Sequence, residues 1–349
     1  MTDILRLTTP DDWHLHVRDG AMLACVLPDT VRQFARAIIM PNLVPPVATV
    51  SAALAYRQRI LDAVPAGMSF EPLMTLYLTE QTTADDIAEA ADCPHVHAVK
   101  YYPAGATTNA ASGVRDLNRV QAVLAAMEKH DMPLLMHGEV TDREVDVFDR
   151  EAVFIERHLL TLIKDFPGLR MVMEHITTRA AAELLRDGPE TLAATVTVHH
   201  LLLNRNAMFD GGLRPHHYCL PLIKRETHRQ ALLAAVASGH PRLFLGTDSA
   251  PHPKGAKEAD CGCAGIYTAP HAMALYAEVF DDLDALDRLE AFASFNGPDF
   301  YRLPRNTGTI ELARGAESIA EQVDFGGAPG VPFRAGGETR WRLVTARAH

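Results

Sequence analysis

The sequence predicts an α/β fold, a (β/α)8 TIM barrel with a short C-terminal cap segment. Short apolar or β-branched runs alternate with stretches long enough for amphipathic helices, which is the pattern of βα units in a parallel sheet. Eight such runs are present, and eight parallel strands close a barrel. The chain has 349 residues, which fits one barrel of about 250 residues with insertions.

The eight predicted strands follow from these runs. We expect the first to end near His16 and the others to span 37–40, 73–78, 97–101, 134–137, 171–175, 194–198 and 243–247. Crossover helices are predicted at 50–63, 83–91, 117–130, 148–166, 178–187 and 226–238, with a last helical stretch around 271–289. Thr178 marks a helix start, and Gly188-Pro189 marks the stop of the same helix.

The chain has no internal repeat, low-complexity tract or obvious linker, so we expect residues 1–349 to form a single barrel domain. From Pro304 the sequence is rich in glycine and proline, with strand-like pieces at 309–312 and 341–344. We interpret residues 304–349 as an extension packed on the barrel rather than as a second functional domain.

Composition limits the compartment and the partners. The first twenty residues contain several charges and no apolar run, so we expect no secretory signal, and no apolar run approaches the length of a membrane span. Five cysteines favour free thiols in a reducing compartment, and we expect a cytoplasmic protein. The net charge of −11 disfavours nucleic acid and anionic membranes as partners, but local arginines or metal ions would still hold a small anionic substrate.

Polar side chains end five of the predicted strands. They are His14 and His16 on the first strand, Lys100 on the fourth, His137 on the fifth, His175 on the sixth and Asp248 on the eighth. The carboxyl ends of barrel strands share one rim, so we expect these six groups to converge. Residues two apart on a strand face the same way, which makes the first two histidines a metal-ligand pair. Taken singly, each group has an ordinary explanation, such as a snorkelling lysine or an N-cap aspartate.

Lys100 is an unusual member of a metal site, because an ammonium repels cations. A buried lysine with a lowered pKa would be neutral and would react with carbon dioxide, and the resulting N6-carboxylysine would bridge two cations. A hydroxide between two Zn²⁺ ions would then attack an amide carbonyl, and Asp248 would pass its proton to the leaving nitrogen. The expected ligands are His14, His16 and Asp248 for one Zn²⁺, and His137 and His175 for the other.

The order His-X-His, Lys, His, His, Asp resembles that of the amidohydrolase superfamily, and local strings resemble its shorter bacterial dihydroorotases. The matching strings include Trp13-His14-Leu15-His16-Val17-Arg18-Asp19-Gly20, Met40-Pro41-Asn42-Leu43, Lys100-Tyr101-Tyr102-Pro103, His137-Gly138-Glu139-Val140, Glu174-His175-Ile176-Thr177-Thr178 and Gly246-Thr247-Asp248-Ser249-Ala250-Pro251-His252. The resemblance covers nearly the whole chain. It implies a zinc-dependent cyclic amide hydrolase, a homodimer, that interconverts (S)-dihydroorotate and N-carbamoyl-L-aspartate in de novo pyrimidine (UMP) biosynthesis.

The same resemblance implies residues that bind the substrate. Arg18 would share the face of His16 if the strand continued, and its planar guanidinium would pair with the substrate's unreacting carboxylate. Asn42 and His252 resemble the companions of this arginine, although without the resemblance we would interpret them as turn and loop residues. Backbone groups around Leu220 and Ala264 resemble the partners of the ring amide.

The segment 104–113 follows Lys100 closely and consists of small and polar residues. We interpret it as a lid whose Thr107 and Thr108 hydroxyls reach the substrate on closure and exclude water. An ordinary mobile loop is the alternative. Tyr102, beside the lysine, would line the site.

Other histidines and cysteines are given no catalytic role. Cys261-Gly262-Cys263 resembles half a zinc knuckle, but no second pair lies at a suitable spacing, and Cys25 and Cys219 are isolated in the sequence. His199-His200 follows the seventh strand and is interpreted as a loop or supporting pair. The polar segment Asn204-Arg205-Asn206 predicts no particular function.

Two other functions remain open. A hydantoinase or an allantoinase would share the metal centre and the fold, but a substrate without a carboxylate would leave the Arg18 guanidinium unpaired. A catalytically dead barrel that serves as an assembly scaffold would have no reason to keep six ligands. Metal content and a substrate comparison distinguish these functions.

Overall fold

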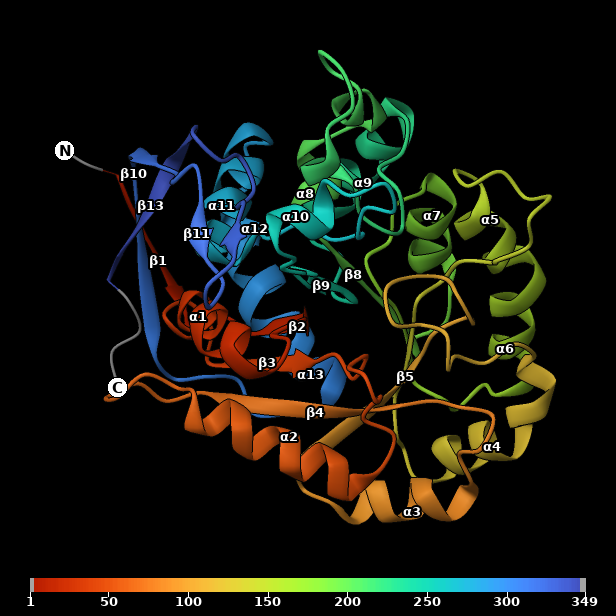
Figure 1. The fold of residues 1–349 in the computed structure, drawn as a ribbon. Coiled ribbons are helices and arrows are strands. Elements are labelled where there is room, and N and C mark those ends of the chain that lie inside the picture. The colour runs from red at the N-terminus through yellow and green to blue at the C-terminus, as the bar shows by residue number, and fades with distance from the viewer. Residues whose placement is uncertain (1–2, 346–349) are drawn as a thin grey trace.

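Eight parallel strands form a barrel in the computed structural model, which describes residues 3–345 (Figure 1). The strands lie side by side in chain order. They are β2 (Asp12–Leu15), β3 (Arg36–Ile39), β4 (Glu71–Tyr77), β5 (Val96–Tyr101), β6 (Leu134–Met136), β7 (Met171–Met173), β8 (Leu192–Val196) and β9 (Leu243–Leu245). The barrel closes just beyond β2 and β9, where the Asp248 N–H donates to the His14 carbonyl at 2.9 Å and the His16 N–H donates to the Ser249 carbonyl at 3.2 Å. The predicted (β/α)8 barrel is confirmed.

Helices surround the barrel and connect its strands (Figure 1). They are α1 (Gly20–Val31), α2 (Val50–Asp62), α3 (Ala84–Asp92), α4 (Gln121–Lys129), α5 (Arg150–Phe154), α6 (Leu160–Asp165), α7 (Arg179–Asp187), α8 (Val198–Leu202), α9 (Glu226–Ala237), α10 (Lys254–Lys257), α11 (Ala272–Asp282), α12 (Leu286–Glu290) and α13 (Asn296–Tyr301). Shorter 3₁₀ segments are Leu117–Val120, Arg205–Met208, Pro215–His217 and Ala269–His271, and π-helical segments are Ile155–Leu159 and Ala291–Phe295.

The start and stop residues predicted for the helix at 178–187 are confirmed. Thr178 is the N-cap of α7, and its hydroxyl accepts a hydrogen bond from the Ala181 N–H at 3.2 Å. Helix α7 ends at Asp187, directly before Gly188. The single helix predicted at 148–166 is instead α5 and α6 joined by a π-helical turn. The sequence prediction missed α1, α8, α10 and α13.

Large apolar side chains fill the barrel interior. Trp13, Phe244 and Tyr301 belong to this inner core, and the rings of Trp13 and Tyr301 stack with their centroids 4.5 Å apart. The interior is therefore a packed core, and catalytic chemistry is confined to its ends.

The period of two along a strand explains how polar groups reach the carboxyl end of this core. Leu135 of β6 belongs to the inner core, and His137, two residues later, lines a cavity at that end. Ala98 of β5 belongs to the same core, and Lys100 follows it at the same spacing. The apolar residue fixes the strand's register, and the register in turn aims the polar residue.

A second sheet lies beside the barrel and joins the two ends of the chain. Strand β1 (Ile4–Thr8) pairs antiparallel with β10 (Thr309–Ser318), which pairs with β13 (Glu338–Thr345) (Figure 1). Strands β11 (Val323–Asp324) and β12 (Pro329–Gly330) form a small ribbon. Trp341 is buried, and its indole N–H donates to Asp281 of α11 at 3.2 Å. Strand β1 was not predicted, and residues 346–349 of the expected extension lie outside the described residues.

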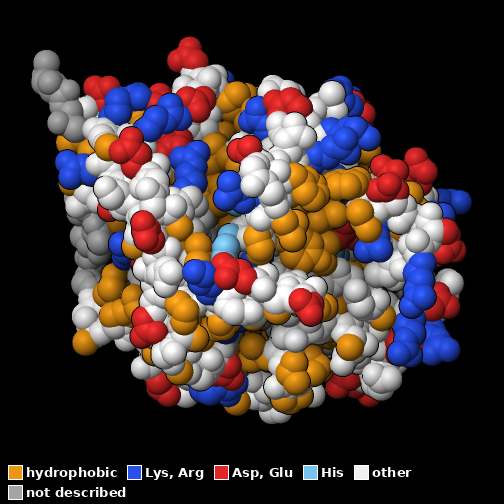
Figure 2. Space-filling view, turned by 45° about the horizontal axis from the view of Figure 1, so that its top comes forward, with side chains coloured by type: hydrophobic (Ala, Val, Ile, Leu, Met, Phe, Trp, Pro, Cys, Tyr) orange, Lys and Arg blue, Asp and Glu red, His pale blue; other side chains and the backbone are white. Residues whose placement is uncertain are grey.

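The surface carries charges of both signs. Figure 2 shows one face on which acidic and basic side chains are interspersed around a central hydrophobic patch. Within residues 3–345, none of the helices is both long enough and apolar enough to cross a bilayer.

Candidate active site

Four of the predicted ligands are imidazoles that meet at the carboxyl end of the barrel. The ring centroid of His14 lies 5.4 Å from that of His16 and 4.9 Å from that of His175, which lies 4.9 Å from that of His137. These four rings and Asp248 line one cavity. Lys100 is completely buried, with its Nζ 5.0 Å from the centroid of the Tyr102 ring, and Tyr102 also lines the cavity.

Asp248 lies against His14 of β2 and against His16, which follows the end of that strand. Its Oδ1 is 3.1 Å from His16 Nε2 and 3.4 Å from His14 Nε2, and ligand atoms of all three residues lie within 4.8 Å of one another. Burial lowers the pKa of His16 to about 4, so this ring is neutral at pH 7 and has a lone pair to offer. Burial opposes charge on Asp248, but the His14 and His16 imidazoles hold its pKa well below the usual range. This donor set fits a divalent cation.

Two further buried groups have polar atoms without partners. Lys100 Nζ and His175 Nδ1 form no hydrogen bond with any described residue. Such an unsatisfied buried atom costs about 1–3 kcal/mol. Burial lowers the pKa of Lys100 to about 8 and that of His175 well below its ordinary value. Unpaired, easily neutralised donors beside the first three ligands fit a second cation position.

Glu174 orients the histidines and was not predicted as a site residue. Its Oε2 accepts hydrogen bonds from His14 Nδ1 at 2.7 Å and from the Thr195 hydroxyl at 2.7 Å. The Thr195 hydroxyl oxygen also accepts the His175 N–H at 2.7 Å. A Cβ on Gly246 would lie 2.8 Å from Thr195 Cβ, so glycine is required beside this group. Because Glu174 accepts the hydrogen bond from Nδ1, the Nε2 of His14 faces Asp248.

Glu139 makes the equivalent contact with His137. Its Oε2 lies 2.7 Å from His137 Nε2, and both side chains are buried. His137 therefore keeps its Nδ1 free for a ligand. Glu139 and Glu174 stand beside predicted ligands in the sequence, and an acidic residue at the end of an apolar strand was the available signal.

Arg18 reaches the cavity by a different route from the one predicted. Strand β2 ends at Leu15, and Arg18 has a left-handed φ of 58°, so the expectation of a continuing strand is wrong. The Tyr56 hydroxyl donates to the Arg18 carbonyl and holds this turn. The Arg18 guanidinium donates to the Pro251 carbonyl at 2.9 Å and to His252 Nε2 at 2.8 Å. Burial and then the Arg18 charge lower the pKa of His252 to about 2, so His252 is neutral.

His175 and Asp248 also have left-handed backbones, with φ of 41° and 44°. Residues other than glycine rarely adopt this conformation, and such strain concentrates at functional sites. Both residues follow short strands, and the sharp turn aims each side chain into the barrel end rather than along the rim.

Five more residues that were predicted to bind the substrate or to close over it line the same cavity as Arg18. They are Asn42, Thr107, Thr108, Leu220 and Ala264. Asn42 Nδ2 donates to the Thr108 carbonyl at 3.0 Å, and Asn109 Nδ2 donates to the Asn42 carbonyl at 2.9 Å, so the segment 104–113 is folded over the cavity. The remaining space is about 20 Å³, enough for about one water molecule.

Comparison with known proteins agrees with this geometry. The model of the amidohydrolase family matches residues 11–317. A dihydroorotase of Cupriavidus necator is 63% identical over 342 residues, which cover 98% of this chain and 99% of the relative. The chain belongs to the amidohydrolase family, among its dihydroorotases.

Solved structures of dihydroorotases are also similar to this amidohydrolase. The Campylobacter jejuni enzyme has a TM-score of 0.90 at 36% identity and covers 98% of both chains. The Saccharomyces cerevisiae enzyme, solved in complex with 5-fluoroorotic acid, has a TM-score of 0.91 at 32% identity and covers 99% of this chain and 100% of that one. The likeness therefore extends over the barrel and the second sheet together.

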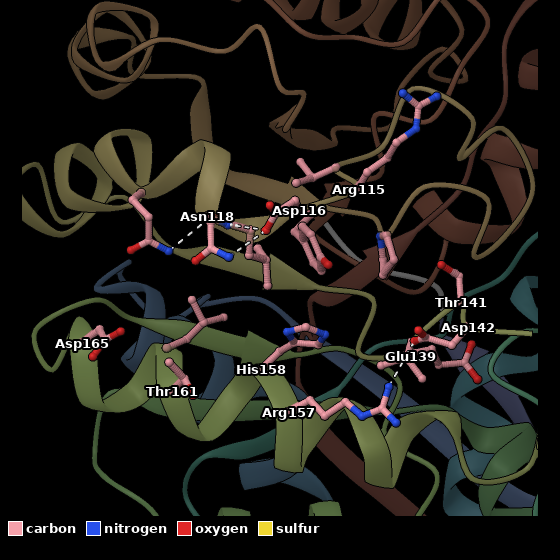
Figure 3. Close-up of a pocket in the computed structure, with 17 residues that line it drawn as sticks. Arg115, Asp116, Asn118, Glu139, Thr141, Asp142, Arg157, His158, Thr161 and Asp165 are labelled. Atoms are coloured by element: carbon pink, nitrogen blue, oxygen red, sulfur yellow. Dashed lines mark hydrogen bonds and ion pairs between the residues drawn. The ribbon is translucent and has the colours of Figure 1, made fainter. Parts of the chain in front are cut away.

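A larger cavity of this amidohydrolase, about 670 Å³, lies outside the barrel end, between residues 114–121 and helix α6 (Figure 3). Its charged side chains partly pair with one another, as Arg157 does with Asp142 at 3.4 Å. Glu139 lines this cavity, but its Oε2 is turned to His137. The charged groups there do not gather around one point, unlike the four imidazoles and Asp248 of the smaller cavity.

The expectation that His199 and His200 are loop residues is wrong, whereas the expectation of free thiols is confirmed. His199 and His200 lie on helix α8 and are buried, and their ring nitrogens and the Cys219 Sγ include atoms that lie within 4.8 Å of one another. This cluster does not favour a metal, however, because both ring nitrogens of His200 are hydrogen-bonded, to the Thr197 hydroxyl at 2.7 Å and to the Pro221 carbonyl at 3.0 Å. All five cysteines, Cys261 and Cys263 included, have free thiols. Asn204 caps the 3₁₀ segment Arg205–Met208.

Proposed function

We propose that this chain catalyses the reversible interconversion of (S)-dihydroorotate and N-carbamoyl-L-aspartate, the ring-closing step of de novo pyrimidine biosynthesis. One observation carries the proposal: four imidazoles and Asp248 line a small cavity together with Arg18, which forms no ion pair with a carboxylate of any described residue. A buried guanidinium without an anion calls for an anionic ligand. The yeast relative's complex with 5-fluoroorotic acid, a pyrimidine ring that carries a carboxyl group, supports the same substrate class.

We propose two Zn²⁺ ions per chain, bridged by N6-carboxylysine at Lys100. The neutral Lys100 amine would add to carbon dioxide, forming an N–C bond and releasing one proton, and the product is an anionic carbamate. When bound, the two zinc ions would supply Lewis-acid polarisation of the amide carbonyl and a water nucleophile active at neutral pH. The ligands would be His14, His16 and Asp248 for one ion and His137 and His175 for the other.

The chain's own residues would bind the substrate and move its proton. Asp248 would accept a proton from the attacking water and return it to the ring nitrogen as the amide opens. Arg18, with Asn42 and His252 beside it, would hold the carboxylate. Backbone groups at Leu220 and Ala264 would hold the ring amide. Thr107 and Thr108 would close over the bound ring and exclude water.

A hydantoinase or allantoinase activity accounts less well for the buried Arg18. Hydantoin and allantoin carry no carboxylate, so neither would neutralise this guanidinium. A scaffold protein without activity would gain nothing from the unpaired buried atoms Lys100 Nζ and His175 Nδ1, which cost stability.

The test is a substrate comparison on the pure protein with its metal counted. We expect turnover of dihydroorotate and of N-carbamoyl-L-aspartate, with little or none of hydantoin and allantoin. Faster turnover of hydantoin or allantoin would contradict the proposal. Bound zinc without turnover of any of these compounds would also contradict it.

We further propose a cytoplasmic homodimer in which residues 1–349 form one barrel domain and residues 304–349 pack on it. The small-molecule substrate would be its only other partner, without nucleic acid or membrane. Light scattering on the purified protein tests the dimer, since a monomer or a larger assembly would exclude it.

A further inference from the structure

Lys257 is a buried lysine that lies outside the expected metal centre. It ends the short helix α10, and only 4% of its surface is exposed. Lysine is almost never fully buried unless its charge is paired. Here the partners are backbone carbonyls: Nζ donates to Tyr218 at 2.7 Å, to Cys263 at 2.8 Å and to Gly265 at 2.7 Å. Three acceptors use all three hydrogens of the ammonium group.

The three carbonyls belong to the two segments that bring backbone groups to the cavity. Tyr218 lies two residues before Leu220, and Cys263 and Gly265 flank Ala264 on both sides. Leu220, Ala264 and Gly265 all line the cavity. One ammonium group therefore holds both halves of the expected site for the ring amide.

Other hydrogen bonds hold each segment separately: the Cys263 N–H donates to the Ala256 carbonyl at 3.0 Å, and His200 Nε2 donates to the Pro221 carbonyl at 3.0 Å. Residues 218–222 and 262–265 belong to no helix or strand, and the direct bond between them is the Gly265 N–H to the Tyr218 carbonyl at 3.0 Å. That carbonyl is also an acceptor of Lys257, so the ammonium lies where the segments meet. Carbonyl groups turned toward a common cation lose their shared partner if the charge is removed, and they then repel one another.

The ammonium also adds positive charge near the carboxylate side of the cavity. Burial, then Arg18, then Lys257 depress the pKa of His252, which contacts the Arg18 guanidinium. A lysine at this position favours an anionic substrate electrostatically without contacting it.

We propose that Lys257 is a positioning residue for substrate recognition: it holds the backbone at Leu220 and Ala264 in the arrangement that receives the ring amide. This inference rests on the proposed function and deepens it. Lys257 is not among the expected metal-ligating or substrate-binding residues, and its ammonium group supports the side of the cavity that would receive the ring amide.

The experiment compares Lys257→Met with Lys254→Met. Lys254 lies on the same helix and makes no side-chain hydrogen bond to another described residue, so its variant loses the same charge without disturbing these carbonyls. We expect Lys257→Met to raise the KM for dihydroorotate and the Kd for 5-fluoroorotic acid roughly tenfold or more, with a smaller change in kcat and with zinc content unchanged. Lys254→Met keeps wild-type values.

A second variant covers the case in which Lys257→Met does not fold. Lys257→Arg keeps the charge, but a planar guanidinium does not match three carbonyls that converge on one point, so KM and Kd still rise. Wild-type KM and Kd in the folded Lys257→Met protein, or in Lys257→Arg where the methionine variant is unfolded, overturn the inference. Failure of the proposed function is distinct, because the wild-type protein would then not turn over dihydroorotate at all.

Discussion

The His14 imidazole donates from Nδ1 to Glu174 Oε2 at 2.7 Å, and this contact decides which nitrogen of the ring faces Asp248. A buried carboxylate behind a histidine ligand fixes the tautomer and raises the basicity of the free nitrogen. Glu174 also accepts from Thr195, whose hydroxyl oxygen accepts the His175 backbone N–H. Two ligands from distant parts of the chain are thus held through one carboxylate.

Replacing Glu174 by glutamine will weaken metal binding. An amide is a weaker acceptor than a carboxylate and loses part of its hold on His14, so we expect affinity for zinc to fall roughly 10–100-fold. Competition with a chromophoric chelator measures this. Glu183→Gln, on the exposed surface of α7, is the matched control. Equal zinc affinity in both variants would show that Glu174 does not orient a ligand.

Replacing Arg18 by methionine will selectively weaken ligands that carry a carboxylate. Charge-assisted hydrogen bonds contribute about 1.5–3 kcal/mol each, so we expect the KM for dihydroorotate to rise roughly 10–100-fold. Any weak turnover of hydantoin, which has no carboxylate, serves as the internal control and changes little. Equal weakening of both substrates would remove the reason to prefer dihydroorotate.

Replacing Asp248 by asparagine will remove turnover in both directions while metal remains bound. The remaining ligands keep the cation, but an amide does not carry the proton, and general acid–base catalysis is worth about 10²–10⁴-fold in rate. Zinc analysis alongside forward and reverse assays checks both statements. Near-normal rates in this variant would remove Asp248 from proton transfer.

Acid will destabilise the fold partly through His199. Burial lowers its pKa to about 4, against about 6.5 in the unfolded chain. Between these values the unfolded chain binds a proton that the folded chain does not, so this contribution is complete above pH 6.5 and is lost as the pH falls toward 4. In His199→Gln, we expect the free energy of unfolding to drop less between pH 7 and 4.5, by about 2–3 kcal/mol.

Urea titrations of chelator-treated protein at the two pH values measure this difference, because the chelator removes the separate effect of metal release. An identical pH dependence in the variant and the wild type would mean that His199 takes up its proton without unfolding.

Much of the fold could be predicted because barrel strands are recognisable from short, local runs of apolar residues. The run from Leu243 to Leu245 and the run from Met171 to Met173 are short, apolar and followed by polar residues, and both form strands. Strand β1 was missed because its partner β10 lies some three hundred residues later, and its pairing is not a local property. Helix α8 was missed because its histidines suggested a loop.

The expected metal ligands could be named from type and position, but their supporting groups could not. Glu174 contacts His14 from 160 residues away, and Lys257 contacts Tyr218 from 39 residues away, so no local spacing shows either contact. Glu139 is only two residues from His137, but its role depends on the burial of both side chains, which the sequence does not show. Arg18 was named correctly as a cavity residue, but for a reason that the left-handed turn overturns.

The central claim is a two-zinc hydrolytic centre that depends on Lys100, and the zinc content of Lys100→Ala tests it most directly. We expect wild-type protein to hold two zinc ions per chain and the variant to lose zinc and dihydroorotate turnover together. Small carboxylic acids, which would replace the carbamate, should partly restore both. A Lys100→Ala protein that holds two zinc ions and turns over dihydroorotate without an added acid would contradict the claim.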